Sequence, residues 1–164
     1  MSILYSSKSN NLTSSVSKKK LIEIVKEYYP YKPYVFDEIS ENQKKQKLDN
    51  YNDLALLYTN YAYILYKGLY TLSSTSASDS IQYYKLASSL GSWEALQNLG
   101  HIYYKNCGDD FKLLKKSAIF YYKAWMMAEK KGYENTSAEI KLQMILDTNP
   151  ELIKFLFKNL LRDD

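Results

Sequence analysis

The residues best suited to catalysis are few, and their spacing does not bring them together. His101 is the single histidine and Cys107 the single cysteine. These two residues are six positions apart, which corresponds to about 240° around a helix. Their side chains would therefore not face each other even if one helix contained both. The acidic pairs at 109–110 and 163–164 are typical of helix entries and tails. The sequence therefore predicts no enzyme, metal site or cofactor, because these need more ligands or a nucleophile beside a base.

A different set of residues recurs at a fixed offset of 38 positions. The stretch NYAYILYK at 60–67 returns as NLGHIYYK at 98–105. The stretch SIQYYK at 80–85 returns as AIFYYK at 118–123, and eight positions are identical across the two pairs. A period between about 20 and 50 residues is typical of stacked supersecondary units, each unable to bury its apolar face alone. The repeat therefore favours binding over chemistry.

Apolar periodicity, with start and stop signals, predicts only helices. Pro30 and Pro33 end the first one, and Gly68, Gly91 and Gly132 end three others. The predicted helices cover about 18–29, 37–48, 52–67, 79–90, 93–105, 111–131, 136–146 and 150–162. No segment shows convincing period-2 alternation, so we expect no sheet and assign the chain to the all-α class.

One glycine lies inside a predicted helix, where it costs about 1 kcal/mol relative to alanine. Gly100 falls on the apolar stripe of the 93–105 helix, together with Leu96, Leu99 and Tyr103. The equivalent residue one repeat earlier is Ala62, which is also small. We therefore expect a neighbouring helix to approach closely at this position.

The pattern of residues 83–103 resembles a Sel-one-like repeat, a branch of the tetratricopeptide superfamily. The residues that carry the resemblance are Tyr83-Tyr84-x-x-Ala87-x-x-x-Gly91-x-x-x-Ala95-x-x-x-Leu99-Gly100-x-x-Tyr103. The first unit departs from the motif with Tyr61-Ala62 in place of Leu-Gly, and Gly132 falls 41 residues after Gly91. The resemblance covers about residues 51–148. It implies a right-handed solenoid of about three antiparallel helix pairs, of a kind that usually acts as an adaptor or scaffold without enzymatic activity.

The recurring residues beside the buried stripe form a candidate protein-binding groove. In the families that the pattern resembles, this face of each first helix lines a concave surface. Tyrosine supplies contact area with a polar end, and the two asparagines could hydrogen-bond the main chain of a bound peptide. The alternative is that these residues pack against the neighbouring unit. The candidate residues are Thr59, Asn60, Tyr63, Tyr66, Lys67, Gln97, Asn98, His101, Tyr104 and Lys105.

Positive charge is concentrated at the N-terminus. Residues 1–35 carry six lysines and two glutamates, whereas the remaining residues carry 16 basic and 16 acidic groups. Lys18, Lys19 and Lys20 begin this basic arm. The arm gives an alternative function, a nucleic-acid-associated structural subunit that contacts RNA or DNA, although the neutral body argues against a wider electrostatic footprint.

Three parts are predicted along the chain: a flexible polar tail at 1–17, N-terminal helices with the basic arm at 18–49, and a helical-repeat domain at 50–164. A lone cysteine favours a reducing intracellular compartment, with the cytoplasm expected first and the mitochondrion or nucleus as alternatives. No apolar run approaches the roughly 20 residues that span a bilayer. We predict a non-enzymatic protein–protein interaction module, an adaptor or scaffold subunit of a larger assembly.

Overall fold

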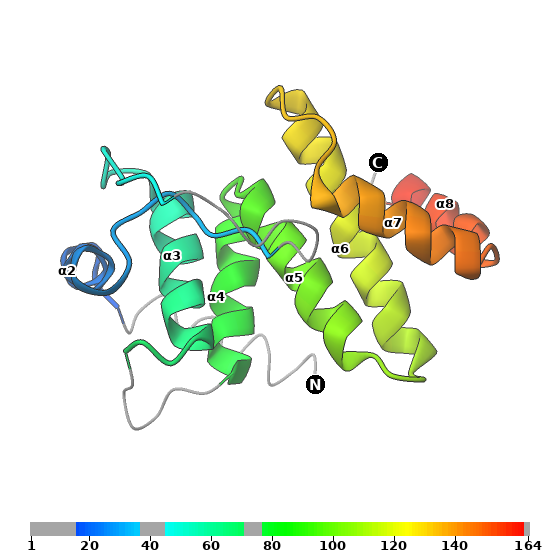
Figure 1. The fold of residues 1–164 in the computed structure, drawn as a ribbon, viewed down its shortest axis with the longest axis horizontal. Coiled ribbons are helices and arrows are strands. Elements are labelled where there is room, and N and C mark those ends of the chain that lie inside the picture. The colour runs from blue at the N-terminus through cyan, green and yellow to red at the C-terminus, as the bar shows by residue number, and fades with distance from the viewer. Residues whose placement is uncertain (1–15, 37–44, 71–76, 163–164) are drawn as a thin grey trace. The chain divides into compact units, whose positions relative to one another are not determined.

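The computed structural model describes residues 16–36, 45–70 and 77–162, and within them the chain forms seven α-helices and no strand (Figure 1). The helices are α2 (Lys18–Tyr28), α3 (Leu54–Tyr66), α4 (Ala77–Ser89), α5 (Trp93–Asn106), α6 (Phe111–Lys130), α7 (Ser137–Thr148) and α8 (Leu152–Arg162). Their ends agree with the predicted ones to within one or two residues, the usual margin for helix boundaries. The all-α assignment is confirmed for the described residues. None of the described helices is long and apolar enough to cross a membrane.

Capping side chains explain where several helices begin. The starts of α2, α3, α6 and α7 each follow a side chain that accepts a hydrogen bond from a main-chain N–H of the first turn. These side chains belong to Ser17, Asp53, Asp110 and Thr136. The main-chain N–H of Lys112 donates to the carboxylate of Asp110 at 2.9 Å, so this acid serves as a helix cap. At the end of α4, Gly91 has a φ of +104°, which a residue with a side chain rarely adopts.

The predicted helix at 37–48 is wrong where the structure describes it. Residues 45–48 are not helical, and Lys47 forms an isolated antiparallel bridge with Tyr31. The N–H of Lys32 donates to the Gln46 carbonyl at 2.7 Å, and the N–H of Leu48 donates to the Pro30 carbonyl at 2.9 Å. This long-range pairing replaces the helix, whose polar sequence offered little apolar surface to bury.

Some predicted segments fall outside the described residues. These are most of the polar tail (1–15), the remainder of the predicted helix (37–44) and the terminal acids (163–164), and residues 71–76 are not described either.

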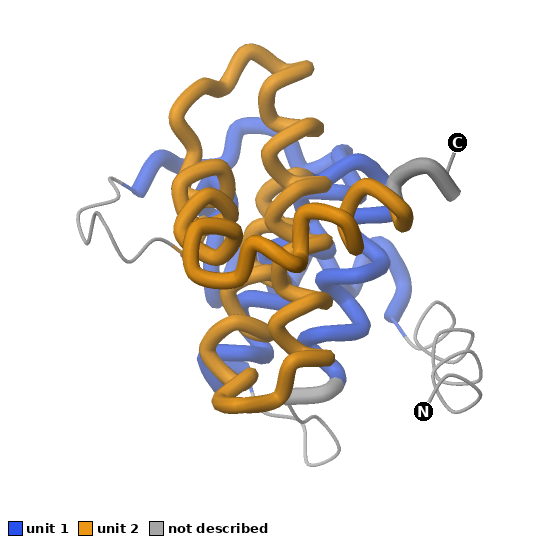
Figure 2. The backbone as a smooth tube through the Cα atoms, turned by 90° about the vertical axis from the view of Figure 1, so that its right-hand side faces the viewer, with its two compact units in different colours: residues 1–34, 42–92 blue, residues 35–41, 93–164 orange. Residues whose placement is uncertain are grey.

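The chain divides into two compact units (Figure 2). Unit 1 comprises residues 1–34 and 42–92, and unit 2 comprises residues 35–41 and 93–164. Within unit 1, α3 packs against α4 and α2; within unit 2, α6 packs against α5, α7 and α8. Each unit therefore contains one pair of successive helices drawn from the 38-residue repeat.

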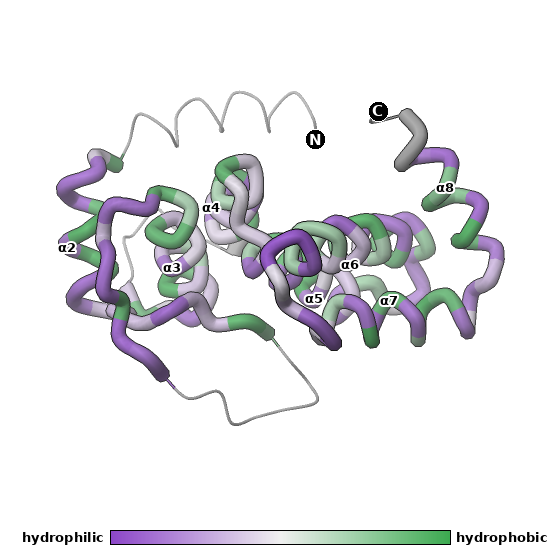
Figure 3. The backbone as a smooth tube through the Cα atoms, turned by 90° about the horizontal axis from the view of Figure 1, so that it is seen from above, coloured by the Kyte–Doolittle hydropathy of each residue, from purple (hydrophilic) through white to green (hydrophobic). Residues whose placement is uncertain are grey.

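Both units bury large aromatic and aliphatic side chains. Tyr61, Tyr84 and Ile64 are among the fully buried side chains of unit 1. The core cluster of unit 2 joins α5, α6, α7 and α8 and has Tyr121 among its members. Along α8, hydrophobic and hydrophilic segments alternate (Figure 3). Its Leu152 and Leu156 belong to this core cluster. Amphipathic helices thus close the core of unit 2.

The close approach expected at Gly100 is present. A Cβ atom added to this glycine would lie 2.7 Å from Cδ1 of Tyr121, a ring on α6 that is 1 % exposed. The Ser117 hydroxyl of α6 also donates to the Gly100 carbonyl at 2.8 Å. The missing side chain therefore makes room for an aromatic ring in the core of unit 2.

Gly100→Ala is expected to destabilise the protein, although alanine is the better helix former. The added methyl group must displace the buried Tyr121 ring, and overpacking of this kind typically costs about 1–3 kcal/mol. The melting temperature should fall by several degrees. Lys105→Ala, an exposed change on the same helix, is the control. An unchanged or raised melting temperature for Gly100→Ala would contradict this packing.

Candidate functional site

The predicted groove residues differ in how far solvent reaches them. At most 2 % of the residue surface is exposed for Thr59, Asn60, Gln97 and Asn98. The half-buried members are Tyr63, Tyr66, His101 and Tyr104. The exposed members are Lys67 and Lys105. Residues 59–67 belong to unit 1 and residues 97–105 to unit 2.

In unit 1, Asn60 binds the main chain of residues 29–34, which we call the strap. Its Nδ2 donates to the Tyr31 carbonyl at 2.6 Å and to the Tyr29 carbonyl at 3.2 Å. Asn60 is fully buried, and among the described residues its Oδ1 has no hydrogen-bond partner. A buried acceptor left unsatisfied costs roughly 1–3 kcal/mol. Asn60 therefore donates hydrogen bonds to two main-chain carbonyls, while its side-chain oxygen has no donor among the described residues.

Aromatic rings hold the strap against α3. The Tyr63 ring lies 4.8 Å from that of Tyr29 and stacks on that of Tyr34 at 5.1 Å between centroids. Tyr31 meets Tyr29 edge-on at 5.2 Å, and the Lys45 ammonium lies 5.5 Å from the Tyr31 ring centroid. Such contacts add to the area that the rings bury. Tyr63, one of the predicted groove residues, thus contacts aromatic rings of its own chain.

In unit 2, a corresponding pair of amides binds Phe36. The Phe36 N–H donates to Asn98 Oδ1 at 2.7 Å, and Gln97 Nε2 donates to the Phe36 carbonyl at 3.2 Å. Gln97 Oε1 in turn accepts from the Ala138 N–H at 3.1 Å, at the start of α7. His101 packs its ring against Phe36 at 5.3 Å. Both polar main-chain groups of Phe36 are therefore read by side chains of α5.

The remaining groove residues have separate positions. The Thr59 hydroxyl lies 2.6 Å from the Ala55 carbonyl and 2.7 Å from Ser92 Oγ, so it acts inside unit 1. Tyr104 has the ammonium of Lys141, a lysine only 6 % exposed, 4.9 Å from its ring centroid. The amine beside this tyrosine therefore comes from α7, while the sequence neighbour Lys105 is exposed.

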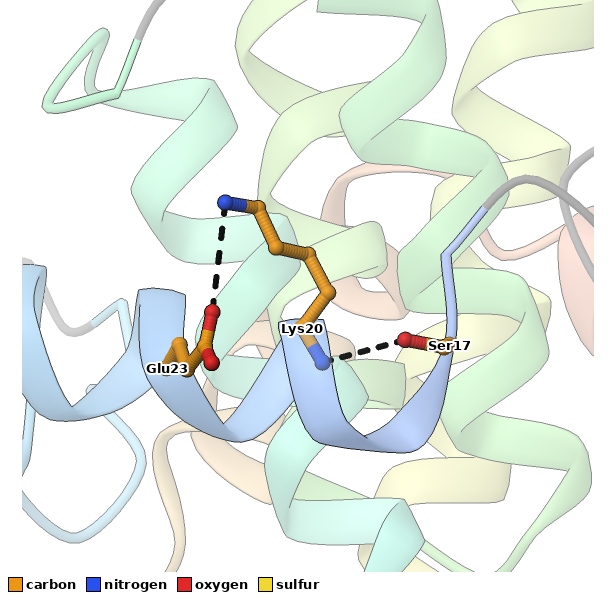
Figure 4. Close-up of polar contacts among 3 residues, drawn as sticks. All are labelled: Ser17, Lys20 and Glu23. Atoms are coloured by element: carbon orange, nitrogen blue, oxygen red, sulfur yellow. Dashed lines mark hydrogen bonds and ion pairs between the residues drawn. The ribbon is translucent and has the colours of Figure 1, made fainter.

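The basic arm lies in the first turn of α2, where Lys18, Lys19 and Lys20 are exposed. Ser17 accepts from the Lys20 N–H at 3.1 Å, and the Lys20 ammonium lies 4.0 Å from the Glu23 carboxylate (Figure 4). An exposed pair of this kind contributes little to stability. The described residues contain no group of three or more histidine, cysteine or acidic side chains placed to hold a metal ion.

The strap itself was missed by sequence reasoning, which treated Pro30 and Pro33 only as a helix stop. Its signal was present, because tyrosines flank and separate these prolines and proline favours extended main chain. The sequence did suggest that Asn60 and Asn98 could hydrogen-bond the main chain of a bound peptide. In this structure, that main chain belongs to the same protein.

No protein-family model, curated protein or solved structure matches this chain. Within the chain, the 38-residue repeat places Asn60 and Asn98 at equivalent positions.

Burial makes the strap sensitive to alkali. Burial, followed by the neighbouring Tyr63, Tyr34 and Tyr31, raises the pKa of Tyr29 from 10.0 to about 12. Burial also raises the pKa of Tyr63, with Tyr34 as a smaller cause. Between these values the unfolded chain loses protons that the folded chain keeps, so the unfolded state gains stability as pH rises.

The contribution of Tyr29 to the free energy of unfolding should accordingly be complete below pH 10 and be lost as the pH rises from 10 to about 12. Tyr29→Phe removes the ionisable group and keeps the ring, so its stability should fall less steeply over this interval. Urea unfolding at several pH values measures the slope. Superimposable pH profiles for the variant and the wild type would contradict the assignment.

Asn98→Ala should expose the Phe36 amide to exchange. This N–H lies outside any helix and depends on Asn98 Oδ1, so it should exchange slowly in the wild type and roughly tenfold faster in the variant. Residue-resolved hydrogen exchange by NMR measures the rate. Gln97→Ala, which removes the bonds to the Phe36 carbonyl and the Ala138 N–H and keeps Asn98, is the control. Equal acceleration in both variants would indicate general loosening of unit 2 rather than loss of one bond.

Proposed function

We propose that this chain is a non-enzymatic protein–protein interaction module, an adaptor or scaffold subunit of a larger assembly. The observation that supports this most is the use of Asn60 and Asn98. Each lies one repeat from the other, and each hydrogen-bonds a non-helical main chain. An amide that binds carbonyl and N–H groups recognises any extended polypeptide, whatever its side chains. A protein segment is therefore the ligand that best fits this chemistry.

The proposal includes an architecture. We infer that the helix pairs α3–α4 and α5–α6 are Sel-one-like units of a short right-handed solenoid, with α7 and α8 as a third, divergent unit. The 38-residue repeat, the packing within each pair and the tight site at Gly100 support this inference. Solenoids of this kind offer extended surfaces built from equivalent positions of successive units.

We expect the partner to contact the predicted groove residues that are not fully buried. Tyr66 and Tyr104 are half-buried near the C-terminal ends of α3 and α5, and each precedes an exposed lysine. Half-buried tyrosines are common anchors in protein interfaces because they combine a large apolar area with a hydroxyl. The recurrence of the Tyr-Lys pair gives each unit one contact of this kind.

The experiment that tests the function is affinity capture of the tagged full-length protein, with and without nuclease, followed by mass spectrometry. We expect protein partners that survive nuclease treatment. Partners that vanish with nuclease would overturn the proposal and transfer the function to the basic arm.

The double variant Tyr66→Ala/Tyr104→Ala should keep its helical content and lose most of its captured partner, by roughly tenfold or more, because each anchor contributes over 1 kcal/mol in typical interfaces. Tyr133→Ala, which removes an exposed tyrosine elsewhere in unit 2, is the matched control and should capture the partner normally. Undiminished capture by the double variant would show that the partner binds another surface.

A further inference from the structure

The strap of unit 1 has the properties of a bound peptide rather than those of a core element. It forms neither helix nor strand, its carbonyls at Tyr29 and Tyr31 are bound by a side chain, and its tyrosine rings dock on Tyr63. Its main chain pairs with residues 46–48 through two hydrogen bonds. Of its six residues, five are half-buried or exposed.

The strap also leaves one hydrogen-bond acceptor of α3 without a partner among the described residues. Asn60 Oδ1 is fully buried and has no hydrogen-bond partner among the described residues. One repeat away, the corresponding oxygen of Asn98 accepts a main-chain N–H at 2.7 Å. Asn60 Oδ1 is therefore suited to accept a hydrogen bond from a main-chain N–H. The strap does not supply such an N–H in this structure. A ligand that supplied it would make one more buried hydrogen bond than the strap makes.

We propose that the strap is an internal ligand of unit 1, and that the protein partner binds α3 in its place. The inference rests on the proposed function and specifies the partner's chemistry. The partner contributes an extended segment with tyrosines spaced by prolines, as in Tyr-Pro-Tyr-Lys-Pro-Tyr at 29–34. Its carbonyls bind Asn60 Nδ2, one of its N–H groups binds Asn60 Oδ1, and its rings replace those of Tyr29 and Tyr34 on Tyr63.

A tethered competitor of this kind lowers the apparent affinity of a free ligand. A short tether holds the strap at an effective concentration on the order of millimolar. The apparent affinity of the partner segment then equals its intrinsic affinity multiplied by the fraction of molecules in which the strap has left its site. A change that loosens the strap, and leaves Asn60 and Tyr63 intact, should therefore strengthen binding of a free peptide.

The test uses the full-length protein and a synthetic peptide of residues 29–34, acetylated and amidated, titrated by NMR. Tyr34→Ala removes the ring that stacks on Tyr63 and should bind the peptide at least about tenfold more tightly than the wild type. Tyr70→Ala is the matched control, because it removes a tyrosine pair with Tyr28 in the same unit and leaves the strap in place. Adding Asn60→Leu to Tyr34→Ala should abolish the gain.

Equal affinity of the folded Tyr34→Ala variant and the wild type would overturn the inference, because the strap would then be a permanent part of the fold. If Tyr34→Ala does not fold, hydrogen exchange in the wild type decides. The Lys32 and Leu48 amides should exchange through local opening, at least about 100-fold faster than the amides in the middle of α3. Exchange only through global unfolding would also overturn it.

The outcome separates this inference from the proposed function. A protein that captures nuclease-insensitive partners and fails the peptide and exchange tests keeps its adaptor role and loses the strap as a competitor.

Discussion

A main chain that crosses a protein surface outside helices and strands must still find partners for its buried N–H and C=O groups. This constraint governs the segment after α2, because Pro30 and Pro33 exclude it from a helix. In unit 1, Asn60 and residues 46–48 satisfy the carbonyls of Tyr29, Pro30 and Tyr31 and the N–H of Lys32. In unit 2, Asn98 and Gln97 bind both polar groups of Phe36. The first helix of each repeat thus supplies buried amides to a partner that is distant in sequence.

The second constraint is the packing of aromatic rings. The sequence has eighteen tyrosines, and several of their rings are buried among the aliphatic side chains of both cores, where the helices must accommodate them. Gly100 admits Tyr121, and in unit 1 Tyr61 meets Tyr83 edge-on at 4.7 Å. Burial raises the pKa of Tyr29 and of Tyr61, so the folded state keeps these phenols protonated and loses stability relative to the unfolded state as the pH rises above 10. A tyrosine-rich core thus accepts a sensitivity to alkali that an aliphatic core would not have.

The local parts of this structure were predictable, and the long-range parts were not. Caps such as Asp53 and Asp110, and turn glycines such as Gly91, act within a few residues, so helix ends could be read from the sequence. The chemistry of the candidate site could be read in part, since amides at equivalent positions suggested main-chain binding. The identity of the bound main chain could not. Asn98 and its partner are 62 positions apart, and no local pattern encodes that distance.

Repetition in sequence does not imply equal use in structure. Asn60 and Asn98 occupy equivalent positions, yet the oxygen of Asn98 accepts a hydrogen bond and that of Asn60 lacks a partner among the described residues. Native proteins rarely retain an unsatisfied buried acceptor, and such departures from good packing concentrate where function requires them. The nitrogen of Asn60 serves the fold, because an apolar residue at this position would leave the Tyr29 and Tyr31 carbonyls without its hydrogen bonds. The oxygen of Asn60 has no such use within the described residues, and it is this end of the amide that the proposed partner would bind.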